Sequence, residues 1–354
     1  MKLVRSTFIV ETEIMINFRF TCAVWGDAFT DTFLNVCLPS VLSEGNLKFI
    51  ASHSDCRFHI YTLPSDVDSL NDAPTIRQLR ALMPVEIVAA TGLTETHKNQ
   101  SYQIMAAAHS DFVKRFNNDG SAMVFISPDT IWGDGSFRRL FDIAQSGKRL
   151  VMLGSVRLNK ESFLVDLQRY MKGRVLQPIG NRMLVRLAMK HLHAETKSLT
   201  WNSGILNTWP SLLFWRVRGE GLLLRAFHLH PLMIRPASNI IPVGQTIDSH
   251  YVEDACPNPD DVCIVLDSDE MVCFELSTKD NRAEVITDKK IGADGIAKWA
   301  DGNTSFRHRQ FIQLRIAFHS DKRGKEWKVS EVMSDGIVSE ILTLLEAASD
   351  YPQA

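Results

Sequence analysis

The sequence lacks the short motifs that identify the commonest nucleotide-binding and hydrolytic enzymes. It has no Gly-x-x-x-x-Gly-Lys-Ser/Thr loop, and no Gly-x-Gly-x-x-Gly follows the first apolar run. These absences argue against a P-loop ATPase and a dinucleotide-dependent dehydrogenase. The sequence also has neither a Gly-x-Ser-x-Gly elbow nor a His-Glu-x-x-His helix, which mark α/β-hydrolases and zinc proteases. Functional residues must therefore be sought in less regular patterns.

Basic clusters and long apolar runs are also missing. The formal net charge is -2 and the Lys and Arg residues are dispersed, so no nucleic-acid partner is expected, because such binding depends on neutralising phosphates. No apolar run reaches the roughly 18 residues of a membrane helix, and no transmembrane segment is predicted. Glu11 and Glu13 interrupt the apolar part of the N-terminal segment, which is not typical of a secretory signal.

Paired cysteines are absent as well. The six cysteines contain no Cys-x-x-Cys pair, and most lie in apolar runs. This distribution is typical of buried free thiols rather than of disulfides or a zinc site. We therefore predict a cytoplasmic protein.

The 354 residues suffice for one large α/β domain with an added lobe. Apolar runs typical of strands alternate with segments of helical periodicity as far as residue 170, which predicts a mostly parallel sheet with helices on both faces. Strands are expected at 16–24, 57–63, 85–90, 122–126 and 149–154. Helices are expected at 31–42, 75–82, 102–116, 136–145, 159–170 and 181–193.

The pattern changes after residue 200. Residues 211–217 and 222–234 flank a Gly-containing turn and predict a β-hairpin, and 262–276 predict a second one. Residues 306–318 and 334–348 have the spacing of amphipathic helices. We place a catalytic domain at 1–275 and a mainly helical extension at 276–354, which would bind an acceptor or a second copy of the chain in a homo-oligomer.

The most informative segment is Ala122 to Phe137, AMVFISPDTIWGDGSF. Its apolar start predicts a buried strand, which Pro128 ends because proline has no backbone donor. Asp129 and Asp134 follow directly. Ligands of open α/β sheets bind beyond the carboxyl ends of the strands, so both carboxylates are expected on the ligand side.

This segment resembles the Asp-x-Asp region of nucleotide-sugar glycosyltransferases of the A-type fold (GT-A). The resemblance implies a Rossmann-like GT-A sheet over about residues 17–275, a nucleotide-sugar donor such as a UDP-sugar, and a divalent metal, manganese or magnesium, held by Asp129. The chain departs from the pattern at Ser127, where the family has its first carboxylate, so the metal requirement is an open question. Three roles are open for Asp134: it would be a second metal ligand, a catalytic residue that binds the sugar hydroxyls, or the cap of the following helix.

A second group of candidates follows one predicted strand. His228 and His230 lie two residues apart and would point to the same face, where paired imidazoles can bind a metal or a phosphate. The resemblance implies that His230 is a metal ligand, with His228 beside the diphosphate. Arg235 would neutralise phosphate. The alternatives are a hydrogen-bonded core histidine and a surface ion pair.

Other candidates lie in loops. Asp248 is the predicted catalytic base, which would deprotonate the acceptor hydroxyl. Trp25 and Gly26 at the first strand exit, with Thr62 and Asp66 at the second, would contact the nucleotide base and ribose. The acidic run from Asp267 to Glu270 is interpreted as a turn rather than a metal site.

The predicted function is therefore transfer of a sugar from a nucleotide donor to a glycan, lipid-linked, protein or small-molecule acceptor. One alternative is a nucleotidyltransferase of related fold, although residues 26–30 lack the Gly-rich, Lys-containing loop usual after its first strand. The other is a catalytically silent interaction protein that retains the fold.

Overall fold

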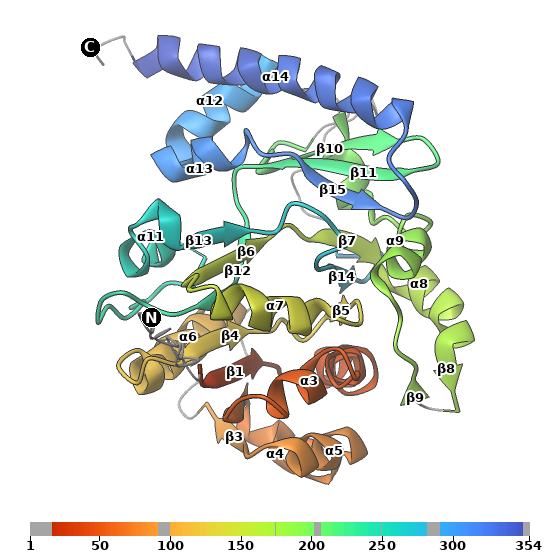
Figure 1. Ribbon diagram of the computed structural model, residues 1–354, viewed down its shortest axis with the longest axis vertical. Coiled ribbons are helices and arrows are strands. Elements are labelled where there is room, and N and C mark those ends of the chain that lie inside the picture. Colours follow the sequence, from red (N-terminus) through yellow and green to blue (C-terminus); the bar gives the residue numbers. More distant parts are fainter. Residues whose placement is uncertain are drawn as a thin grey trace, which may run out of the picture.

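The computed structural model describes residues 16–90, 100–173, 175–201, 207–248, 250–281 and 291–349. A seven-stranded sheet with the order β13-β6-β12-β4-β1-β2-β3 forms its centre (Figure 1). The strands of this sheet are β1 (Phe18–Ala23), β2 (Cys56–Thr62), β3 (Val85–Ala89), β4 (Ala122–Phe125), β6 (Leu150–Leu153), β12 (His230–Ile234) and β13 (Val262–Ile264).

All the strands of this sheet are parallel except β12, which runs antiparallel to both β4 and β6. The prediction of a mostly parallel sheet is therefore confirmed. Because β12 is reversed, its first residue, His230, lies at the edge where the parallel strands end. The strand order reverses between β1 and β4, and open α/β sheets bind their ligands at such a point, beyond the carboxyl ends of the strands.

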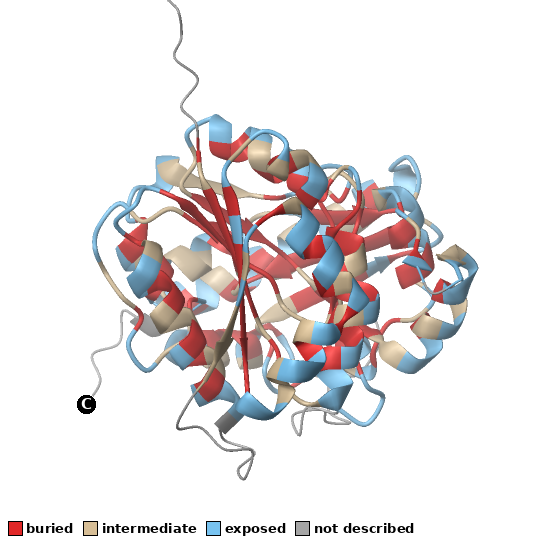
Figure 2. Cartoon of the chain, turned by 90° about the horizontal axis from the view of Figure 1, so that it is seen from below, coloured by how far each residue is buried: buried red, intermediate tan, exposed pale blue. Residues whose placement is uncertain are grey.

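Helices cover both faces of the sheet, as predicted, because side chains alternate along each strand. Met123 and Phe125 of β4 pack on the face that carries α6, whereas Ala122 and Val124 pack on the face that carries α7. Buried strands lie between helices whose outer sides are exposed (Figure 2). The helices are α1 (Asp27–Thr32), α2 (Leu38–Val41), α3 (Leu47–Ala51), α4 (Val67–Asp72), α5 (Pro74–Leu82), α6 (Gln100–Phe116), α7 (Ser136–Gln145), α8 (Lys160–Leu167), α9 (Asn181–Ala188), α10 (Ala194–Ser198), α11 (Tyr251–Ala255), α12 (Ala293–Asn303), α13 (Phe306–Phe311) and α14 (Lys325–Ser349).

Three smaller sheets complete the fold. One has the order β5-β14-β7, one has the order β10-β11-β15, and β8 pairs with β9. Their strands are β5 (Thr130–Trp132), β7 (Val156–Asn159), β8 (Met171–Lys172), β9 (Val175–Leu176), β10 (Leu212–Val217), β11 (Gly221–Ala226), β14 (Cys273–Ser277) and β15 (Ile316–His319).

The β10-β11-β15 sheet and helices α12 and α14 share a core of their own, which we call the upper lobe (top of Figure 1). Antiparallel pairing of β11 with β15 joins segments on either side of residue 275 in one sheet. In the part of the chain that the structure describes, no helix has both the length and the apolar composition needed to span a membrane.

Three expectations for the second half of the chain are wrong. Residues 222–234 form two strands, because the chain leaves the upper lobe at Ala226 and enters the large sheet at His230. Residues 262–276 do not form a hairpin, since β13 pairs with β6 and β14 pairs with β5 and β7. Helix α13 ends at Phe311, and Ile316–His319 is a strand. Each error concerns a short apolar run, for which periodicity does not separate helix from strand.

Arg225 is the largest buried polar group of the upper lobe, with 1% of its surface exposed. Its guanidinium donates to Ser334 Oγ at 2.9 Å and to the Gln313 carbonyl at 2.6 Å, and it forms an ion pair with Asp335. These contacts attach β11 to α14. A buried charge is tolerated only with such partners.

We expect Arg225→Ala to lower the free energy of unfolding by about 3 kcal/mol, because it removes a buried, paired cation and leaves its partners unsatisfied. Urea denaturation followed by circular dichroism measures this change. The control is Arg216→Ala on neighbouring β10, where the side chain is exposed, and we expect less than about 0.5 kcal/mol. Equal effects of the two substitutions would contradict the role given to Arg225.

Candidate functional site

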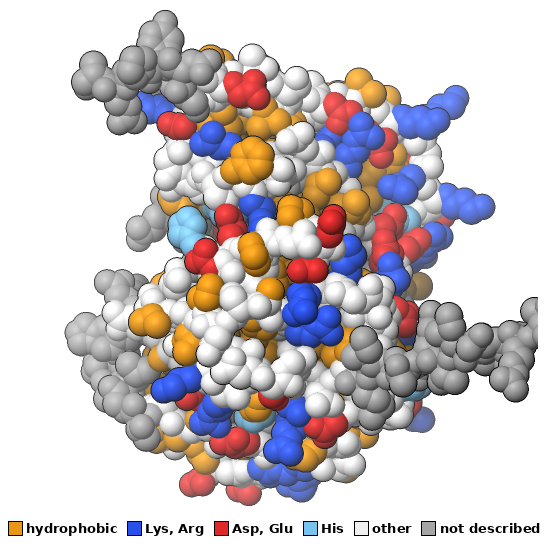
Figure 3. All heavy atoms as spheres, turned by 60° about the vertical axis from the view of Figure 1, so that its left-hand side comes forward, with side chains coloured by type: hydrophobic (Ala, Val, Ile, Leu, Met, Phe, Trp, Pro, Cys, Tyr) orange, Lys and Arg blue, Asp and Glu red, His pale blue; other side chains and the backbone are white. Residues whose placement is uncertain are grey.

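A cavity of about 700 Å³ opens at the carboxyl edge of the large sheet, between this sheet and the upper lobe. Acidic and basic side chains lie side by side along the boundary between the two halves (Figure 3). The cavity is lined by Tyr102, Leu153, Ser155, Arg157, Glu195, Thr196, Leu199, Trp209, Ser211, Leu212, Phe214, His228, Leu229, His230, Thr246, Asp248 and Glu275. The structure thus brings together three predicted site residues, His228, His230 and Asp248.

The pairing of β14 places acidic and basic groups next to one another. Glu275 lies opposite Thr130 of β5 on one side and Arg157 of β7 on the other. The backbone N–H of Leu276 donates to the Asp129 carbonyl at 2.7 Å. Asp129, the first predicted metal ligand, therefore lies directly beside Glu275 at the edge of the cavity.

Arg157 is held between two carboxylates. Its guanidinium lies 2.5 Å from Glu195 Oε2 and 2.7 Å from Glu275 Oε1. Burial raises the pKa of Asp129 to about 7; the nearby charge of Glu275 adds to this effect, and Arg157 and Lys160 oppose it. Arg157 and Lys160 thus offset the effect of Glu275 without returning the pKa of Asp129 to its ordinary value.

Histidines from two elements lie near Asp248. Burial lowers the pKa of His230, while the negative charge of Asp248 and a hydrogen bond to the Phe125 backbone oppose the shift. Burial also lowers the pKa of His109, on α6, to about 4, against the influence of Asp248. Both imidazoles are thus neutral at pH 7, which suits them to accept a proton or bind a metal.

Aromatic and polar side chains border the mouth of the cavity. The rings of His228 and His308 lie 4.3 Å apart, and Trp209 packs edge-on against Trp299 at 5.2 Å. On the opposite side, Tyr102 Oη lies 3.2 Å from Thr246 Oγ1, which in turn donates to Asp248. Asp248 is exposed, so its carboxylate is accessible to a bound molecule.

The two strand exits predicted to contact a nucleotide are joined to each other. The Gly26 N–H donates to Asp66 Oδ2 at 2.8 Å, and Asp66 Oδ1 accepts from Ser65 at 2.9 Å. Trp25 is half-buried and Thr62 is fully buried. Asp66 therefore fixes the loop after β1, and Thr62 lies beneath the surface of this region.

Lys160, at the start of α8, connects helix α1, which follows that loop, to the acidic edge. Its Nζ donates to Thr32 Oγ1 at 2.5 Å and to the Ala28 carbonyl at 3.2 Å, and its charge also acts on Asp129. The loop after β1, Asp129 and the cavity are therefore parts of one continuous region.

Two predicted site residues lie elsewhere. Asp134 Oδ1 accepts from the Gly45 N–H at 2.8 Å, and Asp134 does not cap α7, whose N-cap residue is Gly135. Arg235 follows the other end of β12, where its N–H donates to the Arg149 carbonyl at 2.7 Å. A five-residue strand spans roughly 16 Å, so Arg235 lies at the opposite edge of the sheet from His230.

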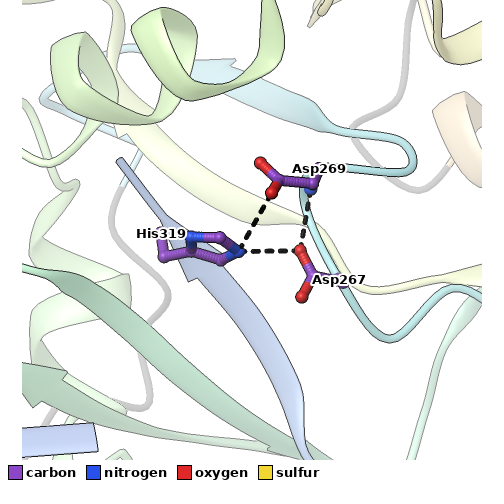
Figure 4. Close-up of side chains that lie close together, drawn as sticks. All are labelled: Asp267, Asp269 and His319. Atoms are coloured by element: carbon purple, nitrogen blue, oxygen red, sulfur yellow. Dashed lines mark hydrogen bonds and ion pairs between the residues drawn. The ribbon is translucent and has the colours of Figure 1, made fainter. Parts of the chain in front are cut away.

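The acidic run near residue 268 forms a separate cluster with His319 (Figure 4). His319 Nε2 lies 2.8 Å from Asp267 Oδ1 and 3.8 Å from Asp269 Oδ2, and Nδ1 lies 2.7 Å from the Asp321 carbonyl. Arg182 pairs with Asp269 at 2.6 Å and Arg323 with Asp267 at 3.5 Å. These carboxylates already have cationic partners, and the cluster joins β15 to the loop before β14.

Several residues of the site were not predicted, and only Glu275 among them had an indication in the sequence. Arg157, Glu195 and Glu275 are ordinary charged residues in amphipathic segments, and Tyr102 and Trp209 are isolated aromatics. The pairing of β14 with β7, between segments distant in sequence, brings Glu275 to Arg157, and α10 brings Glu195 to the same guanidinium. Glu275 alone had a usable indication, since it is an acid within an otherwise apolar strand.

No family model matches the chain, and no curated protein matches its sequence. Among solved structures, the chain is similar to S. aureus TarS, with 8% identity over 93% of this chain and 43% of that one and a TM-score of 0.33. It is also similar to a Bacillus anthracis protein described as a glucose-1-phosphate thymidylyltransferase (13% identity, 41% and 57% coverage, TM-score 0.27). A third similarity is to mouse xyloside xylosyltransferase 1 (10% identity, 45% and 61% coverage, TM-score 0.27). The chain spans less than two thirds of each of these proteins.

We expect the contribution of Asp129 to the stability of the protein to fall as pH rises from about 4 to about 7. The pKa of Asp129 is raised on folding from 3.8 to about 7, so the folded state binds the proton more tightly than the unfolded state and loses that advantage as the proton dissociates. Asp129→Asn should remove this loss and be more stable than the natural protein at pH 8 by on the order of 2 kcal/mol, with allowance for partial solvent exposure.

Thermal unfolding at pH 4.5 to 8.5 measures this difference. Asp142→Asn, at an exposed position on α7, serves as the control and should follow the natural protein at every pH. If the melting temperatures of Asp129→Asn and the natural protein change in parallel with pH, the pKa of Asp129 is not raised on folding.

Proposed function

We propose that this chain is a glycosyltransferase that moves a sugar from a nucleoside-diphosphate donor to an acceptor hydroxyl in the cavity. The observation that carries the proposal is the pair Asp129 and Glu275, two neighbouring carboxylates at the carboxyl edge of the parallel strands. Diphosphate donors require positive charge at such a place. The resemblance of residues 122–137 to the Asp-x-Asp region supports the same assignment.

The charges of the site favour a divalent cation. Asp129, Glu195, Glu275 and Asp248 supply four acidic groups in or beside the cavity, while Arg157 and Lys160 supply two cations. Because four acids against two cations leave an excess of two, a diphosphate would be repelled unless a cation entered with it. We assign Asp129 and Glu275 as its ligands, with His230 on the adjacent strand as a further candidate.

A bound manganese or magnesium ion would neutralise the charge that develops on the departing diphosphate. The residues of the chain supply the other functions. Gly26 and Trp25, in the loop that Asp66 holds, border the position that we assign to the nucleoside. Arg157 is fixed by its two ion pairs and keeps Glu275 oriented toward Asp129. His228 borders the acceptor side of the cavity.

Asp248 is the proposed catalytic base. As the bond between the anomeric carbon and the diphosphate oxygen breaks, a bond forms from the acceptor oxygen to that carbon, and the hydroxyl proton passes to the Asp248 carboxylate. The hydrogen bond from Thr246 holds that carboxylate in place. The exposed position of Asp248 on the cavity wall allows an acceptor to reach it.

We expect the protein to bind UDP or GDP and the corresponding nucleotide sugars in the presence of Mn²⁺, and to lose this binding in EDTA. Asp129→Asn should weaken it at least tenfold, because one ligand of a hard cation is lost. Isothermal titration calorimetry with UDP-glucose, UDP-N-acetylglucosamine and GDP-mannose measures the effect. Asp142→Asn is the control variant.

Failure of every nucleotide sugar to bind, with or without Mn²⁺, would contradict a transferase and favour the interaction protein. Formation of a nucleotide sugar from a nucleoside triphosphate and a sugar phosphate would instead identify the nucleotidyltransferase. The same protein preparation serves for both measurements.

We expect Asp248→Asn to reduce turnover by about 10² to 10⁴ while leaving donor affinity unchanged, because removal of a general base affects the chemical step alone. Release of the nucleoside diphosphate in the presence of mixed acceptors measures turnover, and calorimetry measures donor affinity. Asp254→Asn, on nearby α11, is the matched control. Unchanged turnover in Asp248→Asn would exclude Asp248 as the base.

A further inference from the structure

A second concave site, which we call the basic pocket, lies on the other side of α10 from the cavity. It has a volume of about 380 Å³. Glu195 and Thr196 of α10 line the cavity, whereas Ala194 and Lys197 line the basic pocket. The basic pocket is lined by Asn159, Ser162, Lys190, His191, Leu192, His193, Ala194, Lys197 and Lys279.

The lining of the basic pocket is unusual in its charge. Lys190, Lys197 and Lys279 contribute three ammonium groups, and no described carboxylate lines the pocket. None of these lysines forms an ion pair with a described residue, whereas Arg157, beyond α10, forms two. Three like charges around one concavity repel one another and create a positive potential that attracts anions.

The carboxylates of Asp166 and Glu161, close to the basic pocket, have partners other than the lysine ammonium groups. Asp166 lies 3.1 Å from His191 Nε2 and 3.5 Å from Arg169, and its charge also acts on Lys190. Glu161 Oε2 accepts from the Lys279 N–H at 3.0 Å. These contacts orient the walls of the pocket, and among the described residues no carboxylate pairs with the three lysine ammonium groups.

A buried histidine fixes the three chain segments that form the pocket. His193 is fully buried; its Nδ1 accepts from the Glu195 N–H at 3.2 Å, so Nε2 carries the proton and donates to the Thr278 carbonyl at 3.1 Å. On the facing wall, His191 Nδ1 lies 3.0 Å from Ser162 Oγ. The segments at 159–162, 190–197 and 278–279 are thereby held together, and the concavity is a built feature of the fold.

We propose that the basic pocket binds a phosphate group, either as free inorganic phosphate or as the phosphate monoester of a larger molecule. A phosphate carries up to two negative charges near pH 7 and can accept from several ammonium donors at once. The volume of the pocket admits a phosphate together with part of the molecule that bears it. This inference concerns residues that take no part in the proposed transfer reaction and does not depend on it.

The test is calorimetric titration of the full chain, in EDTA, with inorganic phosphate, with glycerol 3-phosphate and with sodium chloride at matched ionic strength. EDTA removes any contribution from the proposed cation at Asp129. We expect saturable binding of at least one phosphate compound and none of chloride. Tighter binding of inorganic phosphate identifies the free ion as the ligand, and tighter binding of the ester identifies a phosphorylated molecule.

Lys190→Gln combined with Lys197→Gln should weaken phosphate binding at least tenfold. Lys325→Gln combined with Lys328→Gln, two exposed lysines of α14, is the matched control and should bind normally. Because all four side chains are exposed, the melting temperatures without ligand should not change, and Lys279→Gln provides an independent second variant. The proposal is overturned if neither phosphate compound binds, if chloride has the same effect, or if binding persists in both pocket variants.

Discussion

Two neighbouring carboxylates at a half-buried edge are the constraint on which the rest of the site depends. Asp129 and Glu275 lie next to each other because β14 enters between β5 and β7. Burial, with the nearby charge of Glu275 adding to it, raises the pKa of Asp129, and Arg157 is shared between Glu275 and Glu195. On this basis we propose that the site binds a cation, which would neutralise the charge of a diphosphate.

The reversed strand β12 gives the cavity its second wall. After Ala226 the chain crosses from the upper lobe to the large sheet, and the crossing residues His228 and Leu229 line the cavity, as His230 does. The short connection between β11 and β12 therefore lies at the boundary between the upper lobe and the large sheet. We propose that a hydroxyl-bearing acceptor enters the cavity at this boundary, where the exposed side chain of Asp248 also lines the cavity.

Helix α10 separates two sites of opposite charge. On one side Glu195 contributes to the acidic cavity, and on the other Lys197 contributes to the basic pocket. Arg157 and His193 hold the neighbouring segments in place: Arg157 pairs with Glu275, and His193 contacts the Thr278 carbonyl. A donor with its cation and a separate phosphate group would therefore be directed to different places by electrostatics alone.

Local patterns in the sequence determined the elements of the first half of the chain: β4 ends before Pro128 and α7 covers 136–145, as the apolar spacing and the Gly-containing turn predict. They also predicted that Asp129 follows β4 directly, at the carboxyl end of that strand. Tertiary structure alone decided that Arg235 lies at the opposite edge, that Asp134 binds Gly45, and that Glu275 and Arg157 complete the acidic site. The physical reason is that side-chain periodicity encodes which residues form a strand or helix, whereas strand order and register depend on packing between segments distant in sequence.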